Sequence, residues 1–264
     1  IGEVLSDYQE VAPYYAGLPA LFEFAFWYRL KYALNNNAGC YLAKDILNQQ
    51  QAYASFRNDY IEATKLTNHD EYRTASELGR SADKCKLAAA ILLTAPGDPY
   101  IYYGEELGMY GEQTNGDEYV RAPMLWGDSY TTAYTDKIDK SAASNTDTVD
   151  KQLEDKNSLL NTYLTFTRLR NTYPALAEGT MSKHPVYNDS NEKNYKSVAA
   201  WYMTKDNEKL LVIHNLGSSA VTLPLTENIE KAIALLGKAQ QSKSATEFTV
   251  KLDKYSSVVY KLAE

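Results

Sequence analysis

Apolar positions in the first part of the chain repeat with two periods, one typical of strands and one typical of amphipathic helices. The longest apolar stretch has the helical period, and Pro96-Gly97 follows it as a stop signal. In order, the pattern predicts a strand and helix at 18–37, a helix at 40–56, a strand at 60–70, a helix at 76–95 and a strand running into a glycine turn at 99–109. This alternation is typical of parallel βαβ units.

The pattern of hydrophobic and polar residues along the chain changes near residue 180. Residues 127–157 are rich in Ser, Thr, Asp and Lys and too long for an ordinary connection, so we expect a functional or mobile loop there. An amphipathic helix follows at 158–176. Beyond it, short apolar runs between turn residues predict strands at 197–204, 209–216, 220–225, 247–252 and 257–262. We therefore predict an α/β domain at 1–180 and a small all-β domain at 181–264.

Polar side chains gather where predicted strands end. Asn68, His69 and Asp70 follow one another at the end of one strand, although strand interiors disfavour Asn and Asp. Glu3 lies in the opening IGEV, which has the pattern of the end of a buried strand and indicates that the chain is a fragment of a longer protein. In a barrel of parallel strands, catalytic residues lie at these carboxyl ends.

Two carboxylates from different strand ends, facing one cavity, are the arrangement that cleaves a glycosidic bond. One carboxyl group must be protonated to donate to the leaving oxygen, and the others stabilise the positive charge that develops on the sugar. Ile1, Val4 and Leu5 predict an apolar setting for Glu3, which would favour its protonated form. Glu3 is therefore the candidate acid.

Composition and charge limit the other classes of function. The 264 residues are 44% hydrophobic and 23% charged, as in ordinary globular proteins. A net charge of −7 without a long basic run argues against nucleic acid as a partner. The apolar run at 87–95 is far shorter than the about 20 residues that cross a bilayer. Cys40 and Cys85, the two cysteines, exclude a zinc framework and favour buried thiols over a disulfide.

Taken together, several motifs resemble the α-amylase family, glycoside hydrolase family 13. IGEV resembles the end of the family's strand 5, with Glu3 in the acid/base position. TNHDEYR resembles the end of strand 7, where Asp70 matches the transition-state stabiliser and His69 a sugar-binding histidine. GDEYVRAPMLW resembles a later motif, in which Asp117 and Arg121 match residues that bind the glucose before the cleaved bond. The resemblance covers essentially the whole chain.

This resemblance implies a fold and an activity. The fold would be the second half of a (β/α)8 TIM barrel, strands 5 to 8 within residues 1–180, followed by a β-sandwich. The activity would be retaining endo-hydrolysis of α-1,4-glucosidic bonds in starch, malto-oligosaccharides or related α-glucans. Calcium is implied as a cofactor, with its ligands upstream of this chain. Within the family, similarity to the surface amylases of gut bacteria implies export to the cell surface or outer membrane through an upstream anchor, and association with other starch-binding surface proteins.

One motif of the family is missing from the chain. The family's nucleophile is an aspartate in a G-x-R-x-D motif on strand 4, whereas GRSAD at 79–83 has another spacing and falls in a predicted helix. The nucleophile is therefore expected upstream. An α-1,6-active or transglycosylating relative of the neopullulanase type stays open, because no motif fixes the linkage. So does a non-catalytic, amylase-like glycan-binding scaffold, although such scaffolds lose the catalytic carboxylates that Glu3 and Asp70 retain here.

Other polar residues have structural interpretations. Glu105 and Glu106 cannot both face the cavity, because successive side chains of a strand alternate, and we interpret them as structural. His184 and His214 fall in the all-β domain and are also interpreted as structural. No further histidine lies near His69 at ligand spacing, which disfavours a metal site. Three of the 23 tyrosines are candidates for the leaving-group side of the site: Tyr8, Tyr14 and Tyr15.

Overall fold

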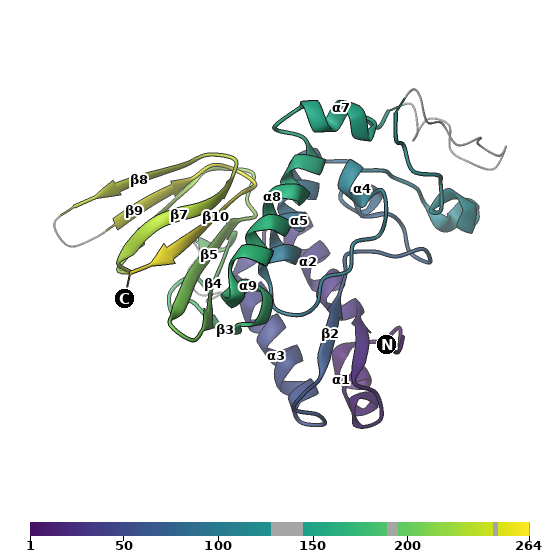
Figure 1. The fold of residues 1–264 in the computed structure, drawn as a ribbon, viewed down its shortest axis with the longest axis horizontal. Coiled ribbons are helices and arrows are strands. Elements are labelled where there is room, and N and C mark those ends of the chain that lie inside the picture. Colours follow the sequence, from purple (N-terminus) through teal and green to yellow (C-terminus); the bar gives the residue numbers. More distant parts are fainter. Residues whose placement is uncertain (128–144, 189–194, 245–247, 264) are drawn as a thin grey trace.

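A computed structural model of the chain describes residues 1–127, 145–188, 195–244 and 248–263. Parallel strands with their helices form the first part, and two antiparallel sheets form the second (Figure 1). Helices α5, α8 and α9 lie between the two parts (Figure 1). The fold class predicted from the pattern of the chain, an α/β part followed by an all-β part, is confirmed, and the all-β part is the β-sandwich that the family resemblance implies.

The parallel sheet has its best-formed pair at β1 (Ala20–Glu23) and β2 (Ile61–Thr64). Single parallel bridges add the segment around Gly2 to β1 and the segment around Tyr100 to the residue after β2. The four segments are therefore neighbours in the order of the chain, as consecutive strands of a barrel are. Their carboxyl ends consequently lie at one edge of the sheet.

The strand predicted at 99–109 is much shorter in the structure. It is reduced to the bridge at Tyr100, because Gly104, at φ 85°, turns the chain into the short 3₁₀ helix η3 (Glu105–Leu107). Glu105 and Glu106 thus belong to η3, and neither ends a strand. The expectation of a strand through these residues was wrong.

Helix ends follow local signals. Glu23 caps α2 by accepting from the backbone N–H groups of Ala25 and Phe26, and the helix closes at Asn37, at φ 51°. The helix predicted at 76–95 is split, because Gly79 and Arg80 both have left-handed backbone angles. GRSAD therefore crosses a turn and does not lie within a helix. The helices of this region are α1 (Tyr8–Val11), η1 (Ala12–Ala16), α2 (Phe24–Asn36), η2 (Gly39–Tyr41), α3 (Leu42–Ala54), α4 (Thr74–Glu77) and α5 (Ala82–Thr94).

The polar stretch at 127–157 is not a loop throughout. Residues 128–144 lie outside the described residues, but α7 (Val149–Glu154) forms within the remainder. Ser158 then caps α8 (Leu159–Thr172) through its hydroxyl, which accepts from Asn161 N at 3.0 Å. Pro174 begins a separate short helix, α9 (Pro174–Glu178), where its missing N–H costs nothing. The loop between η3 and residue 127 holds η4 (Gln113–Asn115) and η5 (Asp117–Tyr119).

The second part of the chain is a β-sandwich. A five-stranded sheet has the order β3-β4-β5-β10-β7, and a three-stranded sheet has the order β6-β9-β8. The five predicted strands all form, and β3, β7 and β8 were not predicted. The strands are β3 (Thr180–Lys183), β4 (Val198–Lys205), β5 (Glu208–Asn215), β6 (Val221–Leu225), β7 (Ile229–Leu236), β8 (Ala239–Lys243), β9 (Phe248–Leu252) and β10 (Ser256–Leu262).

The three central strands of the five-stranded sheet, β4, β5 and β10, are buried on both faces along most of their length. In β4, Val198 and Ala200 point into the sandwich, where they join apolar side chains of the three-stranded sheet. Ala199, Trp201 and Met203 point the other way and share one core with the helices of the first part. This explains why β4 is apolar at nearly every position, although it belongs to an antiparallel sheet.

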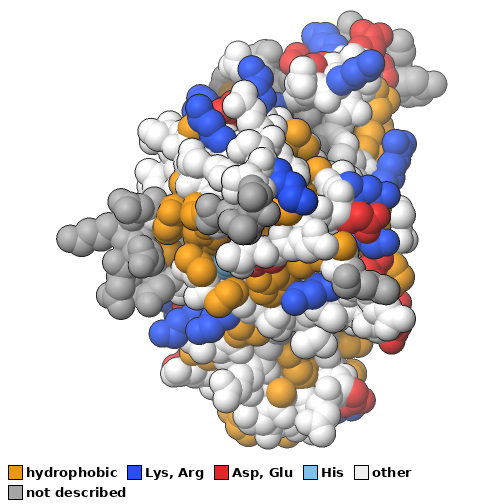
Figure 2. All heavy atoms as spheres, turned by 90° about the vertical axis from the view of Figure 1, so that its left-hand side faces the viewer, with side chains coloured by type: hydrophobic (Ala, Val, Ile, Leu, Met, Phe, Trp, Pro, Cys, Tyr) orange, Lys and Arg blue, Asp and Glu red, His pale blue; other side chains and the backbone are white. Residues whose placement is uncertain are grey.

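On the side of the molecule that carries the sandwich, the surface is neither mainly apolar nor mainly charged. Apolar side chains appear there in separate patches, and Lys and Arg side chains are scattered among uncharged ones (Figure 2). Cys40 and Cys85 are both buried as thiols, as expected. No helix among the described residues is long and apolar enough to cross a membrane.

Candidate functional site

A polar turn follows β2 at the carboxyl end of the strand. Asn68 Oδ1 accepts from the backbone N–H of Asp70 at 2.9 Å, which forms an Asx turn. Leu66, just before the turn, is fully buried. The side chains of His69 and Asp70 are 55% and 48% exposed. The buried strand thus anchors the turn and leaves these two side chains open to solvent.

Arg121 connects this turn to a distant loop. Its Nη2 lies 2.8 Å from Asp70 Oδ1 and 2.9 Å from Asp117 Oδ2. Its Nε donates to the carbonyl of His69 at 3.0 Å, and His69 Nε2 lies 3.2 Å from Asp70 Oδ2. Four residues predicted to bind the same sugar therefore form one hydrogen-bonded network, although about fifty positions separate the two segments.

Aromatic residues after the bridge at Tyr100 support the loop that carries Arg121. The Tyr102 hydroxyl donates to the carbonyl of Val120 at 3.1 Å, and the Tyr103 hydroxyl donates to that of Ala122 at 2.9 Å. The buried guanidinium of Arg73 lies 4.8 and 5.0 Å from the two ring centroids and donates to the Tyr103 carbonyl at 2.8 Å. Arg121 is therefore held in place from the neighbouring strand.

Glu3 lies apart from this network. Its segment pairs with β1 through Gly2, so β1 separates it from the strand that carries Asp70. Glu3 is exposed, and it has no hydrogen bond or ion pair with any described residue. The predicted apolar setting is not formed: Ile1 and Leu5 are 62% and 67% exposed. The segment pairs along one side only, and among the described residues no layer covers these side chains.

Two further expectations are settled by burial. Glu105 is buried, and its Oε1 accepts from the Tyr163 hydroxyl at 2.8 Å, so a structural role fits it. Burial raises the pKa of its carboxyl to about 8. Tyr15 is fully buried and donates to the carbonyl of Ile61 at 3.2 Å, so it was wrong as a candidate for an open site. Tyr14 is exposed and stays a candidate.

Lys65 is a residue that the sequence analysis missed. Its side chain is 3% exposed, forms an ion pair with Glu71, and lies with Nζ 3.8 Å from the ring centroid of Phe24. The signal was present in the sequence, because Lys65 is a charged residue directly after an apolar strand. Its burial, however, depends on Phe24, which comes from another strand.

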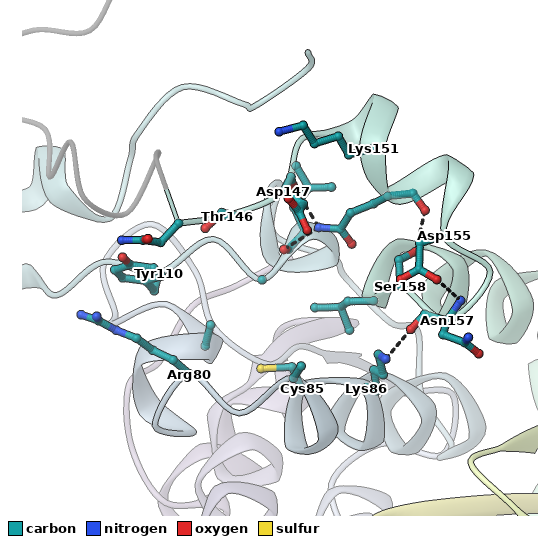
Figure 3. A pocket seen from close by; sticks show the side chains of 17 residues that line it. Arg80, Cys85, Lys86, Tyr110, Thr146, Asp147, Lys151, Asp155, Asn157 and Ser158 are labelled. Atoms are coloured by element: carbon teal, nitrogen blue, oxygen red, sulfur yellow. Dashed lines mark hydrogen bonds between the residues drawn. The ribbon is translucent and has the colours of Figure 1, made fainter. Parts of the chain in front are cut away.

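A cavity of about 410 Å³ lies away from these residues, between α5, α7 and α8 (Figure 3). Arg80, Tyr110 and Lys151 stand around it, and the thiol of Cys85 points into it (Figure 3). Lys86 Nζ donates to the carbonyl of Asn157 at its edge. No residue of the Arg121 network lines this cavity, so it is separate from the strand-end site.

The described residues do not fit a calcium site built from side-chain carboxylates. Among them, no group of three or more His, Cys, Asp or Glu side chains is placed to hold a metal ion. The three acidic and histidine residues of the strand-end site, His69, Asp70 and Asp117, are instead joined through the guanidinium of Arg121, a cation that would oppose a metal there. A calcium site with ligands outside this chain stays a prediction.

Comparison with known proteins gives matches along nearly the whole chain. The family model "Alpha amylase, catalytic domain" matches residues 1–179, and "Alpha-amylase SusG C-terminal domain" matches residues 198–259. Alpha-amylase SusG of Bacteroides thetaiotaomicron is 68% identical over 262 residues, which are 99% of this chain and 38% of that protein. Alpha-amylase 3 of Dictyoglomus thermophilum is 30% identical over 266 residues, 99% of this chain and 51% of that protein.

Solved structures agree with these matches. The crystal structure of an α-amylase from H. orenii aligns with a TM-score of 0.87 at 26% identity, over 99% of this chain and 53% of that chain. This chain thus spans about half, or less, of the length of the relatives it matches. Its fold is therefore similar to that of a solved α-amylase, and the chain belongs to the α-amylase family of glycoside hydrolases.

Proposed function

We propose that the complete protein hydrolyses α-1,4-glucosidic bonds within starch and malto-oligosaccharides, with retention of configuration. The observation that carries this proposal is the Arg121 network, because it brings His69, Asp70 and Asp117 together at the carboxyl ends of the parallel strands. Family membership supplies the class of reaction, and the similarity to α-amylases supports α-glucans as substrates.

In this proposal, Glu3 donates a proton to the leaving glycosidic oxygen while an aspartate outside these 264 residues attacks the anomeric carbon. Glu3 then takes a proton from the water that releases the glycosyl-enzyme. Asp70 is oriented by Arg121 and His69, so its negative charge is fixed in position before positive charge develops on the sugar. His69, Asp117 and Arg121 hold the sugar before the cleaved bond.

Similarity to SusG also supports a proposal for where the protein works. We infer that it is exported to the cell surface or outer membrane and acts beside other starch-binding surface proteins. Surface biotinylation of intact cells, with a cytoplasmic protein as the negative control, tests the location. Recovery of the protein only in the cytoplasmic fraction would contradict it.

The experiment that tests the reaction is Glu3→Gln in the complete protein. We expect kcat on starch to fall by roughly 10²–10⁴, the usual contribution of a general acid. A maltoside with a good leaving group needs no protonation, so its glycosylation step should slow much less. Glu10→Gln changes an exposed glutamate in the same segment and should leave both rates unchanged.

Equal losses on both substrates would exclude Glu3 as the acid. Starch binding without hydrolysis by the unmodified protein would favour the non-catalytic scaffold. Product analysis on starch, pullulan and an isomalto-oligosaccharide distinguishes α-1,4 from α-1,6 cleavage and detects transfer products.

A further inference from the structure

Arg121, on which the strand-end network depends, is carried by a loop and not by a strand or a long helix. Its side chain is 41% exposed, and it follows the single turn of η5. Loops move more than the elements that they connect. A guanidinium that contacts three groups at 2.8 to 3.0 Å therefore needs its backbone to be held by contacts from outside the loop.

A pair of tyrosines holds the two neighbours of Arg121. Val120 is fully buried and Ala122 is 6% exposed, so of these three residues only Arg121 is presented to solvent. The Tyr102 hydroxyl donates to the carbonyl of Val120 at 3.1 Å, and the Tyr103 hydroxyl donates to that of Ala122 at 2.9 Å. Two hydroxyls from successive residues thus bracket one arginine.

The two tyrosine rings are themselves fixed by Arg73. Their centroids are 4.8 Å apart at an angle of 66°, and the Arg73 guanidinium lies 4.8 and 5.0 Å from them. Arg73 is 1% exposed, and its Nε and Nη2 have no hydrogen-bond partner among the described residues, so the rings help to compensate its buried charge. A Cβ at position 104 would lie 3.0 Å from Arg73 Nη1, and Gly104 leaves this space open.

These contacts form a closed ring of residues. Asp70 is paired with Arg121, the next residue is Ala122, and its carbonyl accepts from Tyr103. The Tyr103 carbonyl in turn accepts from Arg73 Nη1 at 2.8 Å. Arg73 lies three residues after Asp70, so the ring returns to its start. The segment that carries Asp70 and the loop that carries Arg121 are therefore joined twice, once directly and once through the tyrosines.

We propose that Tyr102 and Tyr103 are positioning residues of the hydrolase: their hydroxyls hold the backbone on both sides of Arg121 and so place its guanidinium against Asp70. This inference rests on the proposed function, in which Asp70 stabilises the transition state. A displacement of about 1 Å in a catalytic arrangement can lower a rate on the order of 100-fold, so a small movement of Arg121 is enough to be measured.

A double-mutant cycle in the complete protein tests the inference. Tyr102→Phe combined with Tyr103→Phe removes both hydroxyls and keeps both rings, and we expect kcat/KM on starch to fall roughly 5- to 20-fold. The loss should be equal on a maltoside with a good leaving group, because the hydroxyls act on the sugar before the cleaved bond and not on protonation of the leaving oxygen. In Arg121→Ala, where no guanidinium is left to place, the same two substitutions should cost less than about twofold.

Tyr187→Phe is the matched control. The Tyr187 hydroxyl also donates to a backbone carbonyl, that of Pro224 in the sandwich. Its loss should lower the melting temperature about as much as either single substitution in the pair, and it should leave kcat/KM unchanged. A purely structural role of Tyr102 and Tyr103 would give the same result as this control.

The outcomes separate the two proposals. An unmodified protein that does not hydrolyse starch overturns the proposed function. In an active protein, wild-type kcat/KM in the combined variant overturns the positioning role alone, and so does an equal loss with and without Arg121. Melting curves show which variants are folded. If the combined variant does not fold, the cycle with Tyr103→Phe alone decides in the same way.

Discussion

The protein contains two histidine–carboxylate pairs in opposite surroundings. At the strand-end site, His69 Nε2 and Asp70 Oδ2 are 3.2 Å apart, with side chains 55% and 48% exposed. In the sandwich, His184 Nε2 and Glu227 Oε1 are 2.7 Å apart, with side chains 3% and 10% exposed. The chemistry of the two pairs is the same, so the pair alone predicts no function. Its place in the fold decides whether a ligand can reach it.

In the buried pair, both ring nitrogens of the histidine already have hydrogen-bond partners. His184 Nδ1 accepts from the backbone N–H of Val186 at 3.1 Å, so Nε2 carries the proton that is donated to Glu227. The imidazole is also stacked between the rings of Tyr187 and Tyr202, at 4.7 and 5.5 Å. Every face of this histidine contacts protein, whereas His69 and Asp70 keep about half of their surface for a ligand.

The largest effect should come from Asp70→Asn. We expect kcat on starch to fall on the order of 10³-fold, because a fixed charge that stabilises the transition state is lost. Glucan affinity and melting temperature should barely change, since the side chain is half exposed and its replacement is nearly isosteric. The measurements are kcat, binding of an inert oligosaccharide and thermal unfolding. Lost binding with an intact kcat would make Asp70 a ground-state contact and contradict this role.

A smaller loss of activity should follow from Arg121→Lys. A lysine keeps the positive charge but cannot reach Asp70, Asp117 and the His69 carbonyl together from one planar group. We expect kcat/KM on malto-oligosaccharides to fall roughly 10- to 100-fold through misplacement of the sugar contacts. Arg168→Lys, on the exposed face of α8, is the matched control and should be neutral. Wild-type kcat/KM in Arg121→Lys would show that the network does not position the substrate.

A substitution in the buried pair should lower the stability of the protein and leave its activity unchanged. Glu227→Gln removes the carboxylate that accepts from His184 and from the Tyr202 hydroxyl at 2.5 Å. We expect a loss of about 1–2 kcal/mol in the free energy of unfolding and no change in kcat. Although burial raises it, hydrogen bonds from His184 and Tyr202 lower the pKa of Glu227 to about 2. The stabilisation is therefore present above pH 4.5 and lost as pH falls towards 2, so the variant and the wild type should converge in acid.

An effect on stability alone, and only as the pH falls, concerns a third histidine, at the boundary of the two parts. His214 is fully buried, with Nε2 3.2 Å from the Thr94 hydroxyl, and burial lowers its pKa to about 3. The unfolded chain binds a proton at this histidine below pH 6.5, and the folded chain does so only near pH 3. Stability should therefore fall between these values, by at most about 1.4 kcal/mol per pH unit. Urea unfolding at pH 7 and 5 measures it, and His214→Gln should weaken the dependence. An equal slope in that variant would assign the loss to other groups.

Much of the site was open to prediction, because its signals are local. Strand interiors disfavour Asn and Asp, so the run Asn68, His69 and Asp70 alone indicates that a strand ends there and that its end is a functional site. The roles of Asp117 and Arg121 came only from the resemblance to a family. Their contacts with Asp70 depend on the path of a loop, and that path cannot be predicted from the pattern of hydrophobic and polar residues.

The misses have physical causes, and one of them is dependence on distant partners. Lys65 is buried only because Phe24 and Glu71 cover it. The strand β8 escaped prediction because most of its side chains are exposed, so it lacks the alternation that marks a half-buried strand. Ile1 and Leu5 were expected to be buried because they are apolar, but no described neighbour covers them.

The two-faced sheet has a consequence for how this protein could be rebuilt or recombined. The indole of Trp201 donates to the carbonyl of Thr94 at 3.3 Å, and the Arg170 guanidinium donates to the carbonyl of Ala95 at 2.8 Å. The sandwich and α8 together thus complete the end of α5. A chimera that exchanges only residues 181–264 would place a foreign sheet against these helices. An exchangeable unit would have to include α5 and α8 as well as the sandwich, so it would extend across the boundary near residue 180 where the sequence pattern changes.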